Sequence, residues 1–461
     1  MKTSILNTLA DRRNFLKWSC QTALGSSSLL GAIGTLASLG SASVAAQTAP
    51  GYRALVCVYL YGGNDAFNLL VPTDTAGYAK YQKARVRLAI PQADLLPIAS
   101  KTTDGHTYGL HSAATELQSL FAAGHAAFIA NVGTLIAPTS LADYRAGNNL
   151  PPQLFSHYDQ TNQWMTSRPE SSDQTGWGGR LADLLQSPNQ ANGLSMNISI
   201  DGNNLFQTGN TTVPYAMNQS GVQDFDRLNS SDPAERVAAF QAMLDQGGAS
   251  INLLERQQAA AIKQSRALGD TVRGALATAP NFRAMFPAND LGQQLKMVAN
   301  LIASRSQLGA TRQVFFVSMG GFDTHENQPA LQKKLFRNLS QALNAFYNAT
   351  VELGVANSVT TFTESDFGRT LTNNNNGTDH GWGSHHIVVG GGVAGQKIYG
   401  SMPDLTIGGA SDAGDGRIIP TTSTYQYAAT LGQWLGASAS DMATIFPNLS
   451  RFNQANLGFM R

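Results

Sequence analysis

The sequence predicts an α/β protein in which a mostly parallel, doubly wound sheet is flanked by helices. Five short apolar runs end in or are followed by glycine or polar residues, as strands are. The runs are apolar throughout rather than alternating, which is typical of strands covered on both faces. Helical patterns separate them, and strands that alternate with helices are typical of doubly wound folds. The runs begin at Ala54, Ala126, Arg312, Ser358 and His385.

The N-terminal residues predict export. In "DRRNFLKWSC" the pair Arg12 and Arg13 precedes an apolar stretch that ends in small residues near Ala46. This pattern indicates a twin-arginine signal peptide over residues 1–46, which the twin-arginine translocase would recognise. A membrane anchor is the weaker alternative, because the stretch is rich in glycine and serine. We therefore expect the mature chain, residues 47–461, to be periplasmic or secreted and to lack a membrane span.

The clearest helix is predicted from Leu335 to Leu353, with Gly354 as its stop. A second amphipathic stretch, "LGQQLKMVANLIASR", precedes the strand at Arg312. Residues from about 174 to 287 differ, because they are rich in Asn, Gln, Ser and Ala and contain long helical patterns. We interpret them as a mostly helical cap or insertion in the α/β domain of residues 47–461.

Composition excludes two classes of behaviour. Charged residues make up only 13% of the chain, the net charge is +1, and no basic stripe with interleaved aromatics occurs. We therefore expect no binding to nucleic acid. Cys20 would leave with the signal peptide, so Cys57 stands alone in an apolar run and is expected to be a buried strand residue without a disulfide.

Acidic and histidine residues gather where the predicted strands end. In an open α/β sheet, ligands bind outside the carboxyl ends of the strands, so residues distant in sequence are expected to converge there. Carboxylates and neutral imidazoles are ligands of Zn²⁺ and Mn²⁺. Three of the eight histidines fall in "GTDHGWGSHH" alone. The candidates are Asp65, Asp323, His325, Glu364, Asp366, Asp379, His380, His385 and His386.

Each candidate also has a structural explanation. Asn64 and Asp65 could cap a helix after a glycine turn, and Asp366 could cap a helix that begins near Gly368. Asp323 could simply begin a turn. Isolated histidines are usually structural or exposed, and this expectation covers His106, His111, His125 and His157.

Together the motifs carry a resemblance. The signal peptide, "YLYGGNDAFNLLVPTD", "LFSHYDQTNQW", "GGFDTHENQ", "TESDFGRT" and "GTDHGWGSHHIVVGGGV" resemble, in this order, the bacterial family called domain of unknown function 1501. That family is similar to the alkaline phosphatase and sulfatase superfamily. The resemblance covers nearly the whole mature chain and implies an alkaline phosphatase-like α/β fold with one or two divalent metals, namely zinc, manganese or calcium.

The resemblance also implies metal ligands. Asp65 and Asp366 match ligands of one metal and Asp323 and His325 match ligands of the other. A final histidine matches His380 best, with His385 as the alternative. The chain departs from the superfamily pattern at two places. The Asp-x-His spacing is shorter than usual. Phe367 stands where the superfamily has a histidine, and this second departure implies an altered first metal site or a single metal. The residues expected to support the ligands are Asn64, Glu364, Asp379 and His386.

Catalytic candidates follow from the same resemblance. The superfamily nucleophile lies at a helix N-terminus, where backbone N–H groups favour an anion, and Ser156 in "LFSHYDQ" matches it. Ser156 could equally be a plain helix cap. Arg145, Arg168 and Arg369 could pair with phosphate or sulfate, and Arg369 is favoured because it lies within a motif.

The resulting expectation is an exported metal-dependent hydrolase of phosphate or sulfate esters that acts through a serine on a small-molecule or glycan substrate. One alternative is a non-catalytic secreted scaffold or binding protein of the cell envelope that uses a degenerate hydrolase fold. A phosphomutase or transferase could use the same nucleophile, but activated phosphate donors are scarce in the periplasm.

Overall fold

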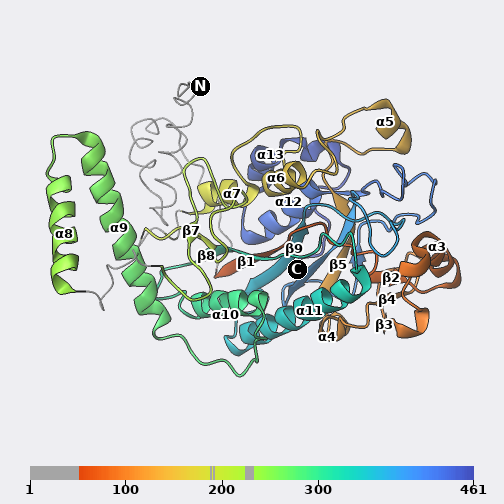
Figure 1. Cartoon of the computed structure of the whole chain (residues 1–461), viewed down its shortest axis with the longest axis horizontal. Coiled ribbons are helices and arrows are strands. Elements are labelled where there is room, and N and C mark those ends of the chain that lie inside the picture. Colours follow the sequence, from red (N-terminus) through yellow and green to blue (C-terminus); the bar gives the residue numbers. More distant parts are fainter. Residues whose placement is uncertain (1–50, 187–188, 190–192, 224–232) are drawn as a thin grey trace, which may run out of the picture.

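A nine-stranded, mostly parallel sheet with helices on both faces forms the centre of the protein (Figure 1). This computed structural model describes residues 51–186, 189, 193–223 and 233–461. The predicted signal peptide, with Cys20, lies outside the described residues. Within them, the predicted α/β architecture is confirmed, and all five apolar runs are strands of the one sheet.

The strand order of the large sheet is β11-β5-β10-β9-β1-β8-β6-β7, with β12 also paired to β5. A small sheet has the order β2-β4-β3. The strands of the large sheet are β1 (Arg53–Leu60), β5 (Ala126–Gly133), β6 (Asn197–Ser199), β7 (Tyr215–Ala216), β8 (Arg312–Met319), β9 (Val359–Ser365), β10 (Ser384–Gly390), β11 (Ile398–Tyr399) and β12 (Thr422–Ser423). Those of the small sheet are β2 (Leu70–Pro72), β3 (Leu96–Ile98) and β4 (Tyr108–Leu110).

Strand β1 lies in the interior of the sheet and is parallel to both of its neighbours, β8 and β9. Its side chains alternate between two hydrophobic clusters, so Val56 packs on one face and Cys57 on the other. Burial on both faces explains why the strand is apolar at every position. Cys57 is buried and forms no disulfide.

Strand β10 is antiparallel to both β9 and β5. Its first residues therefore lie at the sheet edge where β9 ends. This direction matters because the histidine-rich motif precedes β10, whereas the other acidic motifs follow their strands. A parallel β10 would have carried His380 to the opposite edge of the sheet.

Helices cover both faces of the sheet (Figure 1). Helices α4, α10 and α11 pack on one face, and α6, α7, α12 and α13 on the other. No helix within the described ranges combines the length and apolarity needed to cross a bilayer. The helices are α3 (Thr75–Arg85), α4 (Thr115–Ala122), α5 (Leu141–Ala146), α6 (His157–Thr166), α7 (Trp177–Leu185), α8 (Ala234–Gly248), α9 (Leu253–Leu276), α10 (Asp290–Ala303), α11 (Gln328–Glu352), α12 (Thr424–Leu435) and α13 (Ala439–Ile445).

The region from 174 to 287 contributes to the sheet as well as to a helical projection. Helix α7 packs on the sheet, and the short strands β6 and β7 extend it beside β8. Helices α8 and α9 pair with each other and extend away from the sheet at the left of Figure 1.

Helix α11 shows why the helical pattern was readable from the sequence. Its buried positions include Leu335, Leu339, Leu343 and Phe346, which recur at three or four residues and form one face. The helix ends at Glu352, and Gly354 adopts a left-handed backbone with φ of +68°, which glycine accepts without strain.

We expect Leu343→Ala to lower the free energy of unfolding by about 2–5 kcal/mol, because it removes buried apolar volume that neighbouring side chains cannot fill. Leu343 is 1% exposed. Val351→Ala on the same helix is the control, since Val351 is 51% exposed and its loss should cost less than about 0.5 kcal/mol. Urea denaturation followed by circular dichroism measures both. Equal effects would contradict this packing of α11.

Candidate metal centre

Three histidines face one carboxylate at the carboxyl edge of the sheet. Nε2 of His325 lies 3.0 Å from Asp323 Oδ1, and Nε2 of His380 lies 3.5 Å from the same oxygen. Nε2 of His157 lies 3.6 Å from Asp323 Oδ2. The Nε2 atoms of His325 and His380 are 3.1 Å apart. The same nitrogen of all three imidazoles is therefore directed at Asp323.

Four separate segments bring these residues together. Asp323 and His325 come from the loop that follows β8, and His380 comes from the loop that precedes β10. His157 is the first residue of α6. The loop after β1 completes the arrangement: Gly62 has φ of +113°, and a Cβ there would lie 2.3 Å from the backbone nitrogen of Asp323. Only glycine allows this close approach.

Each imidazole is fixed through its other nitrogen, Nδ1. Every Nδ1 atom is within hydrogen-bond distance of an oxygen that can only accept, so Nδ1 is the donor, and when a ring is neutral its Nε2 lone pair faces Asp323. Histidines that bind metals are typically oriented by such acceptors. The three contacts are His157 to Asp366 Oδ2 at 2.6 Å, His325 to Asp379 Oδ1 at 3.1 Å, and His380 to the carbonyl oxygen of Phe155 at 2.7 Å.

The Phe155 contact depends on an unusual backbone. Phe155 has φ of +70°, in the left-handed region that bulky residues rarely adopt. Its N–H donates to Gln160 Oε1 at 2.6 Å, which holds the turn, and its carbonyl oxygen is the acceptor for His380. Backbone strain of this kind clusters at functional sites.

Asp323 carries a negative charge that its neighbours stabilise. Burial raises the pKa of Asp323, but a hydrogen bond from Arg369, the charge of Arg369 and the nearby His325 outweigh it, so the pKa lies below its usual value. Arg369 Nη1 donates to Asp323 Oδ1 at 2.8 Å and to the Gly62 carbonyl at 3.2 Å. The Asp366 hydrogen bond raises the pKa of His157, which marks a basic imidazole suited to metal binding.

The residues present fit a divalent cation. His157, Asp323 and His380 place one ligand atom each within 4.8 Å of one another. The Nε2 atom of His157 is enclosed and has no hydrogen-bond partner. Imidazole nitrogen with one carboxylate oxygen is a ligand set suited to Zn²⁺ and related ions. The side chain of Asp323 is still 46% exposed and that of His157 37%, so a small molecule can reach the centre.

Sequence comparison places the chain in a family. The profile described as "Protein of unknown function (DUF1501)" matches residues 52–413. The chain belongs to the DUF1501 family. No curated protein matches it in sequence.

Solved structures with some likeness to this DUF1501 chain include the following two. The crystal structure of Ps i-CgsB in complex with k-i-k-neocarrahexaose is 9% identical, with a TM-score of 0.38, and the match covers 88% of this chain and 78% of that one. The PsFucS1 sulfatase from Pseudoalteromonas sp. is 9% identical, with a TM-score of 0.30, and the match covers 77% of this chain and 66% of that one.

In this DUF1501 chain, Asp65 does not face the three histidines. Its carboxylate forms a buried ion pair with Arg85 at the end of α3, and its second oxygen accepts from Gln328 Nε2 at 2.7 Å. Asp366 likewise serves as the acceptor for His157 and for the Gly62 N–H at 3.1 Å. The two carboxylates expected to share a first metal are thus engaged by protein donors. Asn64, next to Asp65, is buried and its N–H donates to Ser365 Oγ at 2.9 Å.

Phe367 fills the space beside the centre. Its ring is fully buried and its centroid lies 4.8 Å from those of both His157 and His380. A Cβ on Gly63 would lie 2.5 Å from this ring. Among the described residues the ligands therefore gather at one cluster rather than two.

His385 and His386 lie in the core. Burial lowers the pKa of each to about 3, so both are neutral. His385 Nδ1 accepts from the Asn131 N–H at 3.0 Å, and its ring meets the Phe67 ring edge-on. His386 packs against Trp164 on the α6 face.

Three of the four catalytic candidates are held by contacts within the protein, and the fourth, Arg145, is exposed. Ser156 is the N-cap of α6, and its hydroxyl donates to Asp159 Oδ2 at 2.5 Å. Arg369 is fully buried, so it holds Asp323 rather than meeting solvent. Arg168 pairs with Asp173, and Arg145 is exposed on α5.

Two contributors to the cluster, His157 and Phe155, were not predicted from the sequence. His157 directly follows Ser156 in "LFSHYDQ", so its place at a helix start beside a proposed nucleophile was the available signal. Its contact with Asp366 joins residues far apart in the chain, which motif spacing does not show.

Glu364 is buried beneath the centre on β9. Burial raises its pKa to about 8, and Trp177 Nε1 donates to its Oε1 at 3.1 Å. Between pH 4.5, the ordinary value, and pH 8, the unfolded chain releases a proton that the folded chain retains. The stability contribution of Glu364 therefore falls as pH rises through this window.

We expect Glu364→Gln to remove this pH dependence, since Gln does not titrate. The free energy of unfolding of the variant minus that of the parent should therefore be larger at pH 8 than at pH 4.5 by a few kcal/mol, since one pKa unit corresponds to about 1.4 kcal/mol. Denaturant unfolding at several pH values measures the difference between variant and parent. Glu326→Gln, at an exposed position, is the control. Parallel stability curves for the parent and Glu364→Gln would show that Glu364 is ionised in the fold.

Proposed function

We propose that the chain is an exported, metal-dependent hydrolase of phosphate or sulfate esters that binds one divalent cation through Asp323, His157, His325 and His380. The observation that carries the proposal is the common orientation of the three imidazoles, each held through Nδ1 with Nε2 toward Asp323. Export rests on the twin-arginine motif of the sequence.

Zinc and manganese suit this ligand set better than calcium, which prefers oxygen ligands alone. When bound, such a cation polarises an ester oxygen and stabilises charge on the leaving oxygen. The protein residues position the ligands. Arg369 keeps Asp323 ionised and in place. The imidazoles are oriented by Asp366, Asp379 and the Phe155 carbonyl. The four ligand side chains are partly exposed to solvent, so a substrate can approach the cation from that side.

Ser156 is the proposed nucleophile. It precedes the ligand His157, and it lies at the N-terminus of α6, where free N–H groups favour an anionic ester. Its hydroxyl already donates to Asp159 Oδ2, which can accept the proton when Oγ bonds to phosphorus or sulfur. The bond from phosphorus or sulfur to the alcohol oxygen then breaks, and the alkoxide takes a proton from water. Water then hydrolyses the ester formed on Ser156.

A second candidate function is a non-catalytic envelope scaffold or binding protein. Two contacts favour it: Arg85 neutralises Asp65, and Phe367 occupies the space beside the cluster. A single cation would then stabilise the fold without chemistry.

We expect the full chain, exported through its own signal and purified without chelators, to contain about one divalent cation per molecule by inductively coupled plasma mass spectrometry. Asp323→Ala should lose most of it, because the three imidazoles would lack their shared carboxylate. His106→Gln is the control, since His106 pairs with Asp74 on a surface loop. Equal metal content in the parent and Asp323→Ala would contradict the site.

Ser156→Ala separates the two functions. For a hydrolase that uses Ser156, kcat for 4-nitrophenyl phosphate or 4-nitrophenyl sulfate should fall on the order of 10³-fold or more while the metal is retained. Ser140→Ala is the matched control, because Ser140 caps α5 in the same way. Each loss of a cap should cost about 1 kcal/mol of stability. Unchanged turnover in Ser156→Ala would make Ser156 a cap alone.

A further inference from the structure

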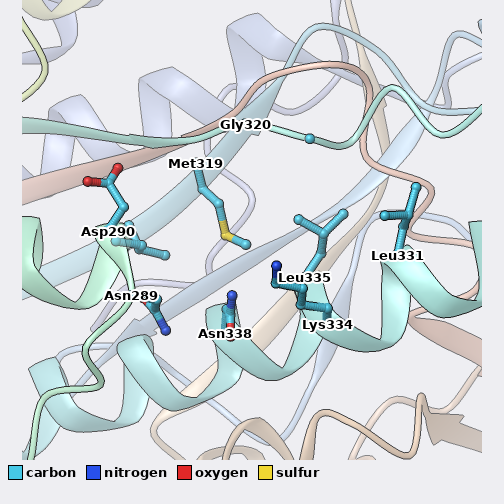
Figure 2. Close-up of a pocket in the computed structure, with 10 residues that line it drawn as sticks. Asn289, Asp290, Met319, Gly320, Leu331, Lys334, Leu335 and Asn338 are labelled. Carbon is cyan, nitrogen blue, oxygen red and sulfur yellow. The ribbon is translucent and has the colours of Figure 1, made fainter.

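A cavity of about 330 Å³ lies between the N-terminal end of α10, helix α11 and the loop after β8. Figure 2 shows Leu331, Lys334 and Leu335 rising from α11 toward the loop that carries Gly320, with Met319 opposite them. The cavity is partly open, and its volume is at the lower end of the range for small-molecule sites.

The lining has two kinds of surface. Met319, Leu331 and Leu335 provide apolar carbon, while Lys334, Asp290 and the amide of Asn338 provide donors and acceptors. Leu331 is exposed although it is a large apolar residue. One ammonium and one carboxylate balance each other, so the lining does not select a charged ligand. An apolar face beside several hydrogen-bonding groups suits an uncharged polyhydroxylated ring.

The cavity wall and the metal centre share the loop that follows β8. Gly320 and Gly321 line the cavity, and Asp323 follows in the same loop. Because consecutive Cα atoms are about 3.8 Å apart, the Cα atoms of Gly321 and Asp323 are separated by at most about 7.6 Å. This separation is within the length of a sugar ester.

We propose that the cavity binds one sugar ring, the alcohol part of an ester whose phosphate or sulfate group lies at the metal centre. This inference rests on the proposed function and narrows its substrate class to sugar esters. The ring would lay a C–H face on Leu331 and Leu335 and direct hydroxyl groups to Asp290, Lys334 and Asn338. Gly320 contributes no side chain, which leaves room for the ring.

Gly320→Leu is one test, because it adds a side chain to the cavity wall at small cost to the fold. A Cβ at Gly320 would meet no atom within 4 Å, and its φ lies outside the left-handed region. Gly274→Leu is the matched control: Gly274 is an exposed residue of α9 that also has open space around it. Lys334→Gln and Lys333→Gln form a second pair, since both lysines are exposed but only Lys334 lines the cavity.

Binding is measured on the metal-loaded full chain by saturation-transfer difference NMR, with methyl glucoside and methyl galactoside as probes and cyclohexylmethanol as the probe without ring hydroxyls. We expect at least one glycoside to bind, with affinity lowered about tenfold or more in Gly320→Leu and lowered in Lys334→Gln. Gly274→Leu and Lys333→Gln should bind like the parent. Unfolding midpoints establish that all four variants are folded.

Absence of glycoside binding, equal binding in Gly320→Leu, or equal binding of cyclohexylmethanol would overturn the inference. Hydrolysis of 4-nitrophenyl esters is followed in the same samples. If those esters are hydrolysed and glycosides do not bind, the sugar subsite fails and the hydrolase stands. If glycosides bind as expected and no ester is hydrolysed, the subsite stands and the hydrolase fails.

Discussion

The candidate metal centre depends on the hydrogen bonds of the buried guanidinium of Arg369. It donates to Asp323, to the Gly62 carbonyl and to the side chain of Thr378, so it joins the loops after β1 and β8 to the loop before β10. Arg369 itself follows β9. A guanidinium without access to water must be fully hydrogen-bonded, and this requirement holds the four loops at fixed separations. The oxygens of Asp323 face three imidazoles because the hydrogen bond from Arg369 fixes the position of its carboxylate.

The direction of β10 supplies the second constraint. Parallel strands β1, β8 and β9 deliver their following loops to one edge of the sheet, and the reversed β10 delivers its preceding loop to the same edge. His380 thus meets Asp323 without a long connection. On the other face, α6 starts at this edge and brings His157. The centre is a product of strand direction and helix placement more than of any one motif.

Much of the fold could be predicted from the sequence because burial on both faces leaves continuous apolar runs, as in β1 and β9. Asp323, His325 and His380 were also visible, since they stand beside strand ends. The ion pair of Asp65 with Arg85 could not be predicted, because Arg85 comes from α3 and no local sequence pattern encodes that contact. The antiparallel direction of β10 was hidden for the same reason: apolar runs show burial but do not show polarity of the chain.

The left-handed backbone at Phe155 has a consequence for how the protein matures. Gln160 holds that strained turn from one side, and the carbonyl oxygen of Phe155 also accepts from His380 once the loop before β10 lies beside it. If the proposed site binds a cation, its affinity depends on the completed tertiary structure, and the cation would in turn favour the folded state by mass action. If the chain is exported in the folded state, as the twin-arginine motif predicts, it would bind its metal ion in the cytoplasm, before other metal ions outside could compete for the site.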